Sequence, residues 1–189
     1  MIVIARPSPN YTYFLSKNKL KQKYFNKNLN FFKYGREALL FGFKTIGLKK
    51  NDKIIVPAYM CDTTLNPLRD FGFKLVFLDV DENLNLPFDQ FKRKVQNDKK
   101  IKGVLLVHYF GFIFKFDEII EFCKVKKLVV AEDCSHSFLS HNFFNHSKIK
   151  SDFMISSARK MIPVKDGGML IFQKKKYAQL SIDKKVYLS

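Results

Sequence analysis

The chain has 189 residues and carries 34 Lys+Arg against 17 Asp+Glu, a formal net charge of +17. Hydrophobic residues make up 47% and charged residues 27%, which is the composition of a globular protein and excludes disordered and fibrous classes. A length near 150 residues corresponds to about one domain. No uncharged apolar run approaches the roughly 18 residues of a membrane span.

The basic excess raises the question of nucleic-acid binding, since the isoelectric point is near 9.8. The excess consists of 29 Lys and only 5 Arg, whereas bidentate contacts to bases and phosphates favour Arg. The lysines are spread over the whole chain, and Phe is abundant while Trp is absent. We interpret the charge as a compositional bias and do not expect a nucleic-acid partner.

The first residues are apolar but lack the basic flank and the length of a signal peptide. The three cysteines, Cys61, Cys123 and Cys134, show no paired spacing, which is typical of a reducing compartment. We therefore expect a cytoplasmic protein.

Along the chain, residues 1–33 show no clean period and are expected to form an irregular lead-in. Apolar residues recur at helical spacing from Gly35 to Leu48. Short apolar runs and helical stretches then alternate. In chain order the strands are Lys53–Val56, Lys74–Asp79, Gly103–His108, Leu128–Glu132, Phe153–Ser156 and Gly168–Phe172, and the helices between them are Thr64–Phe71, Pro87–Val95 and Phe116–Lys126.

Strands that are apolar throughout and alternate with helices indicate an α/β fold: a three-layer α/β/α arrangement with a mostly parallel sheet. The expected domain spans residues 34–173, and 174–189 form a lysine-rich, solvated tail. Ligands of such sheets bind beyond the carboxyl ends of the strands. The segments that follow the apolar runs are therefore the candidate site: 57–62, 79–81, 108–111 and 133–136.

Chemically useful groups occur at these strand ends. Asp133 directly follows an apolar run, and His136 comes three residues later. Lys160 is followed by Asp166-Gly167-Gly168, and Gly35 opens a helix whose N–H groups could hold a phosphate. Pyridoxal phosphate needs a lysine, an acid for its ring nitrogen and a phosphate cradle. The spacing alone is a weak signal for that cofactor.

The ordered set of motifs is more specific. It resembles the DegT/DnrJ/EryC1/StrS aminotransferases, pyridoxal-phosphate enzymes of fold type I that act on keto-sugar nucleotides. The resemblance covers residues 34–172, and its segments are YGREALLFGFKTIGL, DKIIVPAYMCDTTLNPL, FKLVFLDVDENLNL, VLLVHYFGFIFKFDEI, VVAEDCSHSF and DFMISSARKMIPVKDGGMLIF. It implies pyridoxal phosphate as cofactor, glutamate as amino donor, a keto sugar nucleotide as acceptor, and a homodimer or a complementing chain.

The resemblance also implies roles for the residues that carry the reaction. Lys160 matches the lysine that bonds covalently to the cofactor and later moves a proton. Asp133 matches the acid that keeps the pyridine nitrogen protonated. His136 matches a position that contacts the cofactor ring or its 3′-oxygen. Without the resemblance, Lys160 would be read as a solvated surface group, Asp133 as a helix cap and His136 as a packed histidine.

The phosphate end of the site departs from the family pattern. Ser157 matches the phosphate-binding serine, with Ser156 as the alternative because the segment is shorter here. Gly35 and Arg36 fall on the phosphate-cradling turn. Many members have a threonine at the position of Arg36, so a hydroxyl donor is replaced by a guanidinium.

Two further departures leave an alternative open. Cys61 stands where an aromatic ring usually stacks on the cofactor, and Tyr59 could replace that ring only if the turn were re-aimed. Family members are considerably longer and continue into a C-terminal domain. The alternative is therefore an inactive remnant, or one half of a split enzyme that acts as a folding or interaction module.

The remaining histidines and cysteines predict no metal site. Cys134, His136, His141 and His146 lie close in sequence but fit no familiar zinc spacing. His108, at the end of another apolar run, is expected to be structural.

Overall fold

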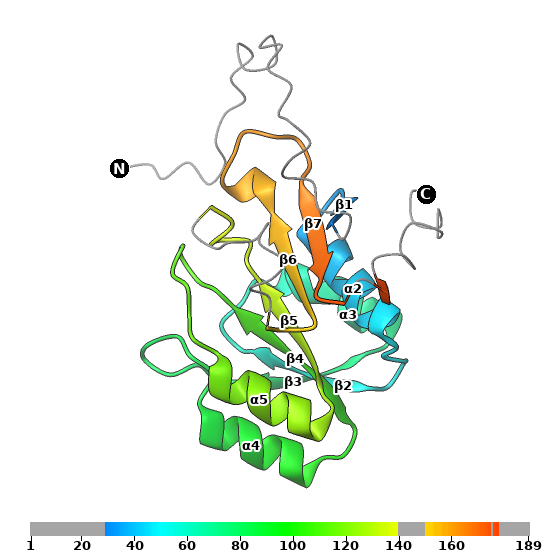
Figure 1. Ribbon diagram of the computed structural model, residues 1–189, viewed down its shortest axis with the longest axis vertical. Coiled ribbons are helices and arrows are strands. Elements are labelled where there is room, and N and C mark those ends of the chain that lie inside the picture. The colour runs from blue at the N-terminus through cyan, green and yellow to red at the C-terminus, as the bar shows by residue number, and fades with distance from the viewer. Residues whose placement is uncertain (1–28, 140–149, 175, 178–189) are drawn as a thin grey trace.

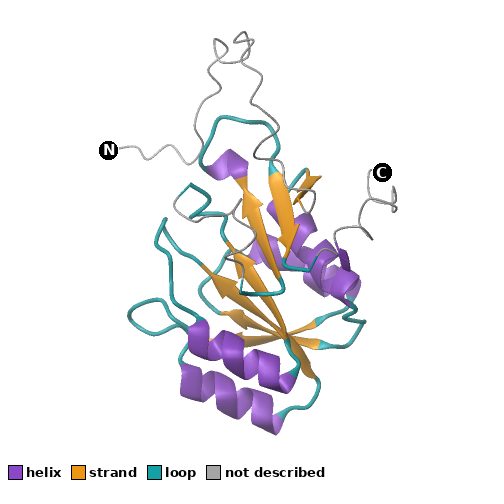
Figure 2. Cartoon of the chain, in the orientation of Figure 1, coloured by secondary structure: helices purple, strands orange, loops and turns teal. Residues whose placement is uncertain are grey.

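The computed structural model describes residues 29–139, 150–174 and 176–177, which form a seven-stranded sheet with helices on both faces (Figures 1 and 2). The strands are β1 Leu29–Phe32, β2 Lys53–Pro57, β3 Lys74–Leu78, β4 Ile101–Val107, β5 Val129–Asp133, β6 Phe153–Ser157 and β7 Gly168–Phe172. The helices are α2 Gly35–Ile46, α3 Asp62–Phe71, α4 Phe88–Asn97 and α5 Asp117–Lys126, together with the short 3-10 helix η3 Ala158–Lys160.

The sheet is mostly parallel, as predicted, and its strand order is β1-β7-β6-β5-β4-β2-β3. Each neighbouring pair from β6 to β3 is parallel, whereas β7 runs antiparallel to both β6 and β1. The chain moves from β2 outward to β3, crosses back to β4 and then continues through β5 to β6. The direction of winding therefore reverses between β2 and β4, where the loops at the strand ends diverge and leave room for a ligand.

The expectation of an irregular segment over residues 1–33 is wrong for its last part. Residues 1–28 lie outside the described residues, but Leu29–Phe32 forms the edge strand β1, with Leu29 opposite Ile171 and Phe32 opposite Gly168. Four residues are too few for a period-2 pattern to be visible. The strand is defined by its pairing with β7, a contact between segments far apart in the sequence. Of the predicted tail, the structure describes only residues 174, 176 and 177.

Each face of the sheet packs against a different pair of helices. Side chains alternate along a strand, so Ile54 and Val56 face one side and Ile55 the other. On the first face α2 and α3 bury the side chains Ala38, Leu39, Phe43, Leu65 and Leu68. On the second face α4 and α5, which lie side by side in Figure 1, bury the side chains Phe91, Val95, Ile119, Ile120 and Cys123.

Helix α2 approaches the sheet closely because it has a glycine at the contact. A Cβ atom on Gly42 would lie 2.3 Å from the ring of Phe153 in β6. The helix then ends at Gly47, whose φ of 111° is the left-handed conformation that favours glycine at a helix end. This packing places the N-terminus of α2 beside the ends of β6 and β7.

Candidate active site

A small cavity of about 80 Å³ lies beyond the carboxyl ends of β2, β4, β5 and β6. Four of the predicted site residues line it: Cys61, Asp133, His136 and Lys160. Its other lining residues are Met60, Thr64, Val107, His108, Tyr109 and Ser135. The sheet thus brings together an amine, an imidazole, a carboxylate and a thiol that are up to 99 positions apart in the sequence.

The amine and the imidazole are in direct contact. Lys160 ends η3, just after β6, and its Nζ lies 3.1 Å from His136 Nε2. Burial, together with the charge of Lys160, lowers the pKa of His136, so the neutral ring can accept a hydrogen bond from the amine. The ring of Phe110 stacks on His136 with centroids 6.1 Å apart. Lys160 itself is exposed, which leaves its amine accessible to a carbonyl compound.

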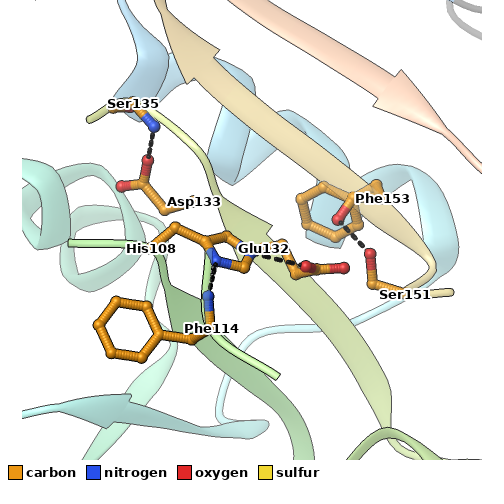
Figure 3. Close-up of polar contacts among 7 residues, drawn as sticks. All are labelled: His108, Phe114, Glu132, Asp133, Ser135, Ser151 and Phe153. Atoms are coloured by element: carbon orange, nitrogen blue, oxygen red, sulfur yellow. Dashed lines mark hydrogen bonds and ion pairs between the residues drawn. The ribbon is translucent and has the colours of Figure 1, made fainter. Parts of the chain in front are cut away.

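The Asp133 carboxylate is buried, with 7% of the residue exposed. Its Oδ1 accepts a hydrogen bond from the Ser135 amide at 2.8 Å (Figure 3). Within the described part of the chain no donor contacts the other oxygen, Oδ2. Oδ2 is not fully buried, so it is accessible from the cavity that Asp133 lines. It therefore fits a ligand that presents a protonated ring nitrogen.

The neighbouring acid, Glu132, points to the opposite face of the sheet. Its Oε2 lies 2.8 Å from His108 Nε2, and the Phe114 amide donates to His108 Nδ1 at 3.1 Å (Figure 3). An accepting Nδ1 leaves the ring proton on Nε2, which donates to Glu132. Both ring nitrogens are thus occupied within the protein, in agreement with the expected structural role of His108. Glu132 was not among the predicted residues, because its pairing with His108 depends on β4 and β5 being neighbours in the sheet.

The predicted phosphate residues lie beside the cavity but do not line it. A Cβ atom on Gly35 would be 3.4 Å from the Ser157 Cβ, and one on Gly168 would be 2.4 Å from the Tyr34 carbonyl oxygen. The N-terminus of α2 therefore sits against the end of β6. The Ser156 hydroxyl donates to the Cys134 carbonyl at 3.4 Å, whereas the Ser157 hydroxyl has no acceptor among the described residues. These contacts favour Ser157 over Ser156 as a phosphate donor.

Tyr59 does not replace the ring that Cys61 lacks. Cys61 is exposed, precedes α3, and its Sγ lies 3.0 Å from the Thr63 hydroxyl. This contact and the charge of Lys160 lower the pKa of the thiol. Tyr59 is 54% exposed, packs on Tyr109 and is absent from the cavity wall. Tyr109 does line the cavity, and its hydroxyl donates to the Tyr59 carbonyl at 2.7 Å.

Larger cavities lie elsewhere in the described part of the chain. One of about 620 Å³ lies at the N-termini of α4 and α5, and one of about 460 Å³ lies beside α4. Neither of these two walls combines an amine with an imidazole. A third cavity, of about 380 Å³, does bring His108 together with Lys115 and Lys150, but both ring nitrogens of His108 are already hydrogen-bonded, to Glu132 and to the Phe114 amide. Among residues 29–139, 150–174 and 176–177, which the structure describes, no group of three or more His, Cys, Asp or Glu could hold a metal ion. In the same part of the chain, every helix is too short or too polar to cross a membrane.

Known proteins with similar sequences include enzymes of sugar-nucleotide metabolism. GDP-perosamine synthase of Escherichia coli O157:H7 is 28% identical over 171 residues, which cover 85% of this chain and 46% of that protein. GDP-4-keto-6-deoxy-D-mannose 3-dehydratase of Escherichia coli O55:H7 is 37% identical over 97 residues, or 51% of this chain and 24% of that protein. The chain thus spans about half the length, or less, of these curated relatives.

Solved structures show the same fold. NtdA from Bacillus subtilis, solved with bound cofactor PMP, has a TM-score of 0.74 at 18% identity over 96% of this chain and 43% of that one. A GDP-4-keto-6-deoxymannose-3-dehydratase with a trapped PLP-glutamate geminal diamine has a TM-score of 0.71 at 24% identity over 93% of this chain and 47% of that one. The profile of one family matches residues 26–182. This chain belongs to the DegT/DnrJ/EryC1/StrS aminotransferase family.

Proposed function

We propose that the chain is the cofactor-binding part, residues 34–173, of a pyridoxal-phosphate-dependent aminotransferase. It would transfer an amino group, with glutamate as donor, to a keto sugar nucleotide in amino-sugar or surface-polysaccharide biosynthesis. The observation that carries the proposal is the convergence of Lys160, His136 and Asp133 on one cavity at the carboxyl ends of the strands. The GDP-sugar relatives support the class of substrate.

The residues at the site fit this cofactor. The free Asp133 Oδ2 would accept a hydrogen bond from the pyridinium nitrogen, and the exposed Lys160 amine is accessible to an aldehyde. Pyridoxal phosphate supplies a ring that takes up the electrons released when a proton leaves the amino donor. A carboxylate at Asp133 would favour the protonated ring in which this uptake is strongest.

The side chains of this chain would then handle the proton. The Lys160 amine is within hydrogen-bonding distance of His136, so it is held at a defined place on the cavity wall. His136, whose pKa is lowered, is a neutral acceptor at pH 7 and would keep the lone pair of the amine oriented. Lys160 is thus the group that would carry a proton to and from the substrate carbon, and His136 would position it.

A second candidate remains relevant because of two specific observations. Cys61 stands at the position where the family carries a stacking ring, and Tyr59 is absent from the cavity wall. The chain could then be an inactive remnant, or could require a second copy or a complementing chain for turnover. Three unpaired cysteines are consistent with the reducing cytoplasm in either case.

Borohydride trapping tests the proposal. The full chain is incubated with pyridoxal phosphate, reduced and digested, and the adduct is mapped by mass spectrometry. We expect the adduct on Lys160, its loss in Lys160→Ala, and its retention in Lys165→Ala, which removes an exposed lysine of the following loop. Label spread over surface lysines in wild type and Lys160→Ala alike would refute cofactor binding at this site.

The first half of the transamination, with glutamate alone, distinguishes an active aminotransferase from an inactive remnant or a split enzyme. Glutamate alone should convert the loaded cofactor to its amine form and release 2-oxoglutarate, which a visible spectrum and a coupled assay detect. Trapping on Lys160 without this conversion would favour the remnant or the split enzyme. Conversion that appears only after a partner chain is added would identify the split enzyme.

A further inference from the structure

The lysines are spread along the sequence, but the fold gathers some of them at one edge of the sheet. Strands β2, β4 and β5 are parallel neighbours, so the connections that lead into them lie at the same edge. Each of these connections carries an exposed Lys-Lys pair. We call these six residues the lysine edge: Lys49, Lys50, Lys99, Lys100, Lys126 and Lys127. The lysine edge lies at the amino ends of the strands, whereas the candidate active site lies at the carboxyl ends.

The three pairs follow one another across the sheet. The Lys53 amide, at the start of β2, donates to the Lys100 carbonyl at 2.9 Å. Strand β4 pairs with β5 from Gly103 opposite Val129. Neighbouring strands lie about 4.8 Å apart, so the three connections span roughly 10 Å of the sheet. At this spacing the six charges can act together on one partner.

The protein does not neutralise the lysine edge. In the part of the chain that the structure describes, none of the six amines forms an ion pair with a carboxylate. The acids beside the pairs have other partners: Asp98 forms an ion pair with Lys53, and Asp52 Oδ2 accepts a hydrogen bond from the Lys49 amide at 2.7 Å. The positive charge of this edge is therefore available to an external anion.

The ends of the helices do not require these amines. Lysines near a helix C-terminus often bind its last carbonyls, but here backbone amides do so. The Gly47 amide donates to the Lys44 carbonyl at 3.1 Å, and the Lys127 amide donates to the Lys124 carbonyl at 3.2 Å. Lys127 has a φ of 56°, the left-handed conformation that favours glycine at a helix end. A lysine is less stable than glycine there, which favours a use of its side chain outside the fold.

An exposed apolar side chain stands beside the lysine edge. Val125, which directly precedes Lys126 in α5, is 78% exposed. Basic side chains around an apolar one suit the headgroup region of an anionic bilayer. Duplex nucleic acid fits less well, because the connections contain no arginine for bidentate contacts to bases and present no helix to a groove.

We propose that the lysine edge binds the surface of an anionic lipid bilayer, with Val125 at the level of the headgroups. Clusters of about four to eight basic residues are typical of such peripheral binding. The proposal goes beyond the proposed function and does not depend on it. Because the cavity of Lys160 lies at the other edge of the sheet, it would face away from the bilayer and stay open to a water-soluble ligand.

Cosedimentation of the full chain with vesicles tests the proposal. Vesicles of about 30% phosphatidylglycerol in phosphatidylcholine should bind the chain in about 0.1 M NaCl and release it in about 0.5 M NaCl, whereas phosphatidylcholine alone should not bind it. The triple variant Lys49→Gln, Lys99→Gln and Lys127→Gln should bind the anionic vesicles about 100-fold more weakly, since each lysine near such a surface contributes about fivefold.

A matched triple variant separates the lysine edge from the net charge of the chain. Lys33→Gln, Lys115→Gln and Lys165→Gln remove the same charge from exposed loops at the opposite edge of the sheet. Their effect on vesicle binding should stay within about threefold, because salt screens charges that lie more than a Debye length from the bilayer. Circular dichroism confirms that both triple variants are folded.

The orientation on the bilayer can be measured independently, because the chain contains no Trp. Val125→Trp places a single indole beside the lysine edge. Phe112→Trp places one in the loop after β4, where Phe112 is 68% exposed. Energy transfer to a dansyl-labelled lipid in the same anionic vesicles should be stronger in Val125→Trp than in Phe112→Trp.

Any of four results would overturn the proposal. They are binding to neutral and anionic vesicles alike, no binding to either, equal losses in the two triple variants, and energy transfer no stronger in Val125→Trp. Binding of duplex DNA that depends on the lysine edge, without binding to vesicles, would identify a nucleic acid as the partner instead. Both triple variants should still form the borohydride-trapped adduct on Lys160, so failure of the bilayer proposal leaves the proposed function standing.

Discussion

At the end of β5, each face of the sheet carries a carboxylate and a histidine, but the two faces differ in how these groups are hydrogen-bonded. On the face of α4 and α5, Glu132 is paired with His108, whose second ring nitrogen takes the Phe114 amide. On the face of α2 and α3, Asp133 keeps one oxygen without a donor from the described residues, and His136 lies against the exposed Lys160 and the ring of Phe110. We call these the closed face and the open face.

This difference in hydrogen bonding determines which of the two acids is available to a ligand. Because side chains alternate along a strand, two consecutive acids must point to opposite faces. The acid whose hydrogen bonds are satisfied internally stabilises the end of the strand and the loop that follows. The acid that keeps a free oxygen beside a cavity is available to a ligand. A carboxylate next to an imidazole is therefore structural or functional according to which partners the fold supplies.

The largest contrast is expected between the cysteines of the two faces. Cys61 is exposed on the open face and its thiol pKa is lowered, whereas burial raises the pKa of Cys123 to about 12. Iodoacetamide at pH 8 should label Cys61 at least about 10³-fold faster, because a buried thiol reacts only when the fold opens. Peptide mass spectrometry over time measures both rates, and Cys61→Ser should remove the fast label. Comparable labelling rates would show that the reagent reaches Cys123 as readily as Cys61, which would contradict the comparison.

A smaller but still large effect should separate the two acids. Glu132→Ala removes the carboxylate that His108 Nε2 contacts at 2.8 Å and leaves a small void, so we expect a loss of about 3 kcal/mol in the free energy of unfolding. Asp133→Asn should change that free energy by less than about 1 kcal/mol but weaken pyridoxal phosphate binding at least about tenfold. Urea unfolding and absorbance titration measure the two quantities. Equal losses of stability in the two variants would contradict the comparison.

The fold was predictable because buried parallel strands are apolar along their whole length. The strand predicted at Gly168–Phe172 has those bounds, and Lys53–Val56 extends by one residue to Pro57. Strand β1 was not predictable, since its four residues are held by pairing with β7 rather than by a pattern of their own.

Part of the candidate site was predictable for the same reason. Asp133 and His136 follow an apolar strand, so their place at the sheet edge follows from chain order. The pairing of Glu132 with His108 was not visible, because it depends on which strands are neighbours and on the alternation of faces. The Arg159 contact with Tyr34 joins segments more than 120 positions apart and has no local signal in the sequence.

The smallest expected effect concerns the protonation of His136. Its pKa lies below the usual value of 6.5, because burial and the Lys160 charge disfavour the imidazolium. Below pH 6.5 the unfolded chain therefore binds a proton that the folded chain resists, so stability is complete above that pH and falls as the pH drops toward the folded pKa. We expect this loss to be the smallest of the effects, because it comes from one half-buried side chain.

Urea unfolding at pH 7.5 and 5.5 measures this loss, and His136→Asn should reduce the difference between the two pH values. Lys160→Met should reduce it less, since that variant removes the neighbouring charge but leaves the imidazole buried. The same titration should weaken the Lys160 contact, because a protonated Nε2 can no longer accept a hydrogen bond. Borohydride trapping on Lys160 should then decline in parallel with stability in wild type. An identical pH dependence of unfolding in wild type and His136→Asn would show that folding does not change the pKa of His136.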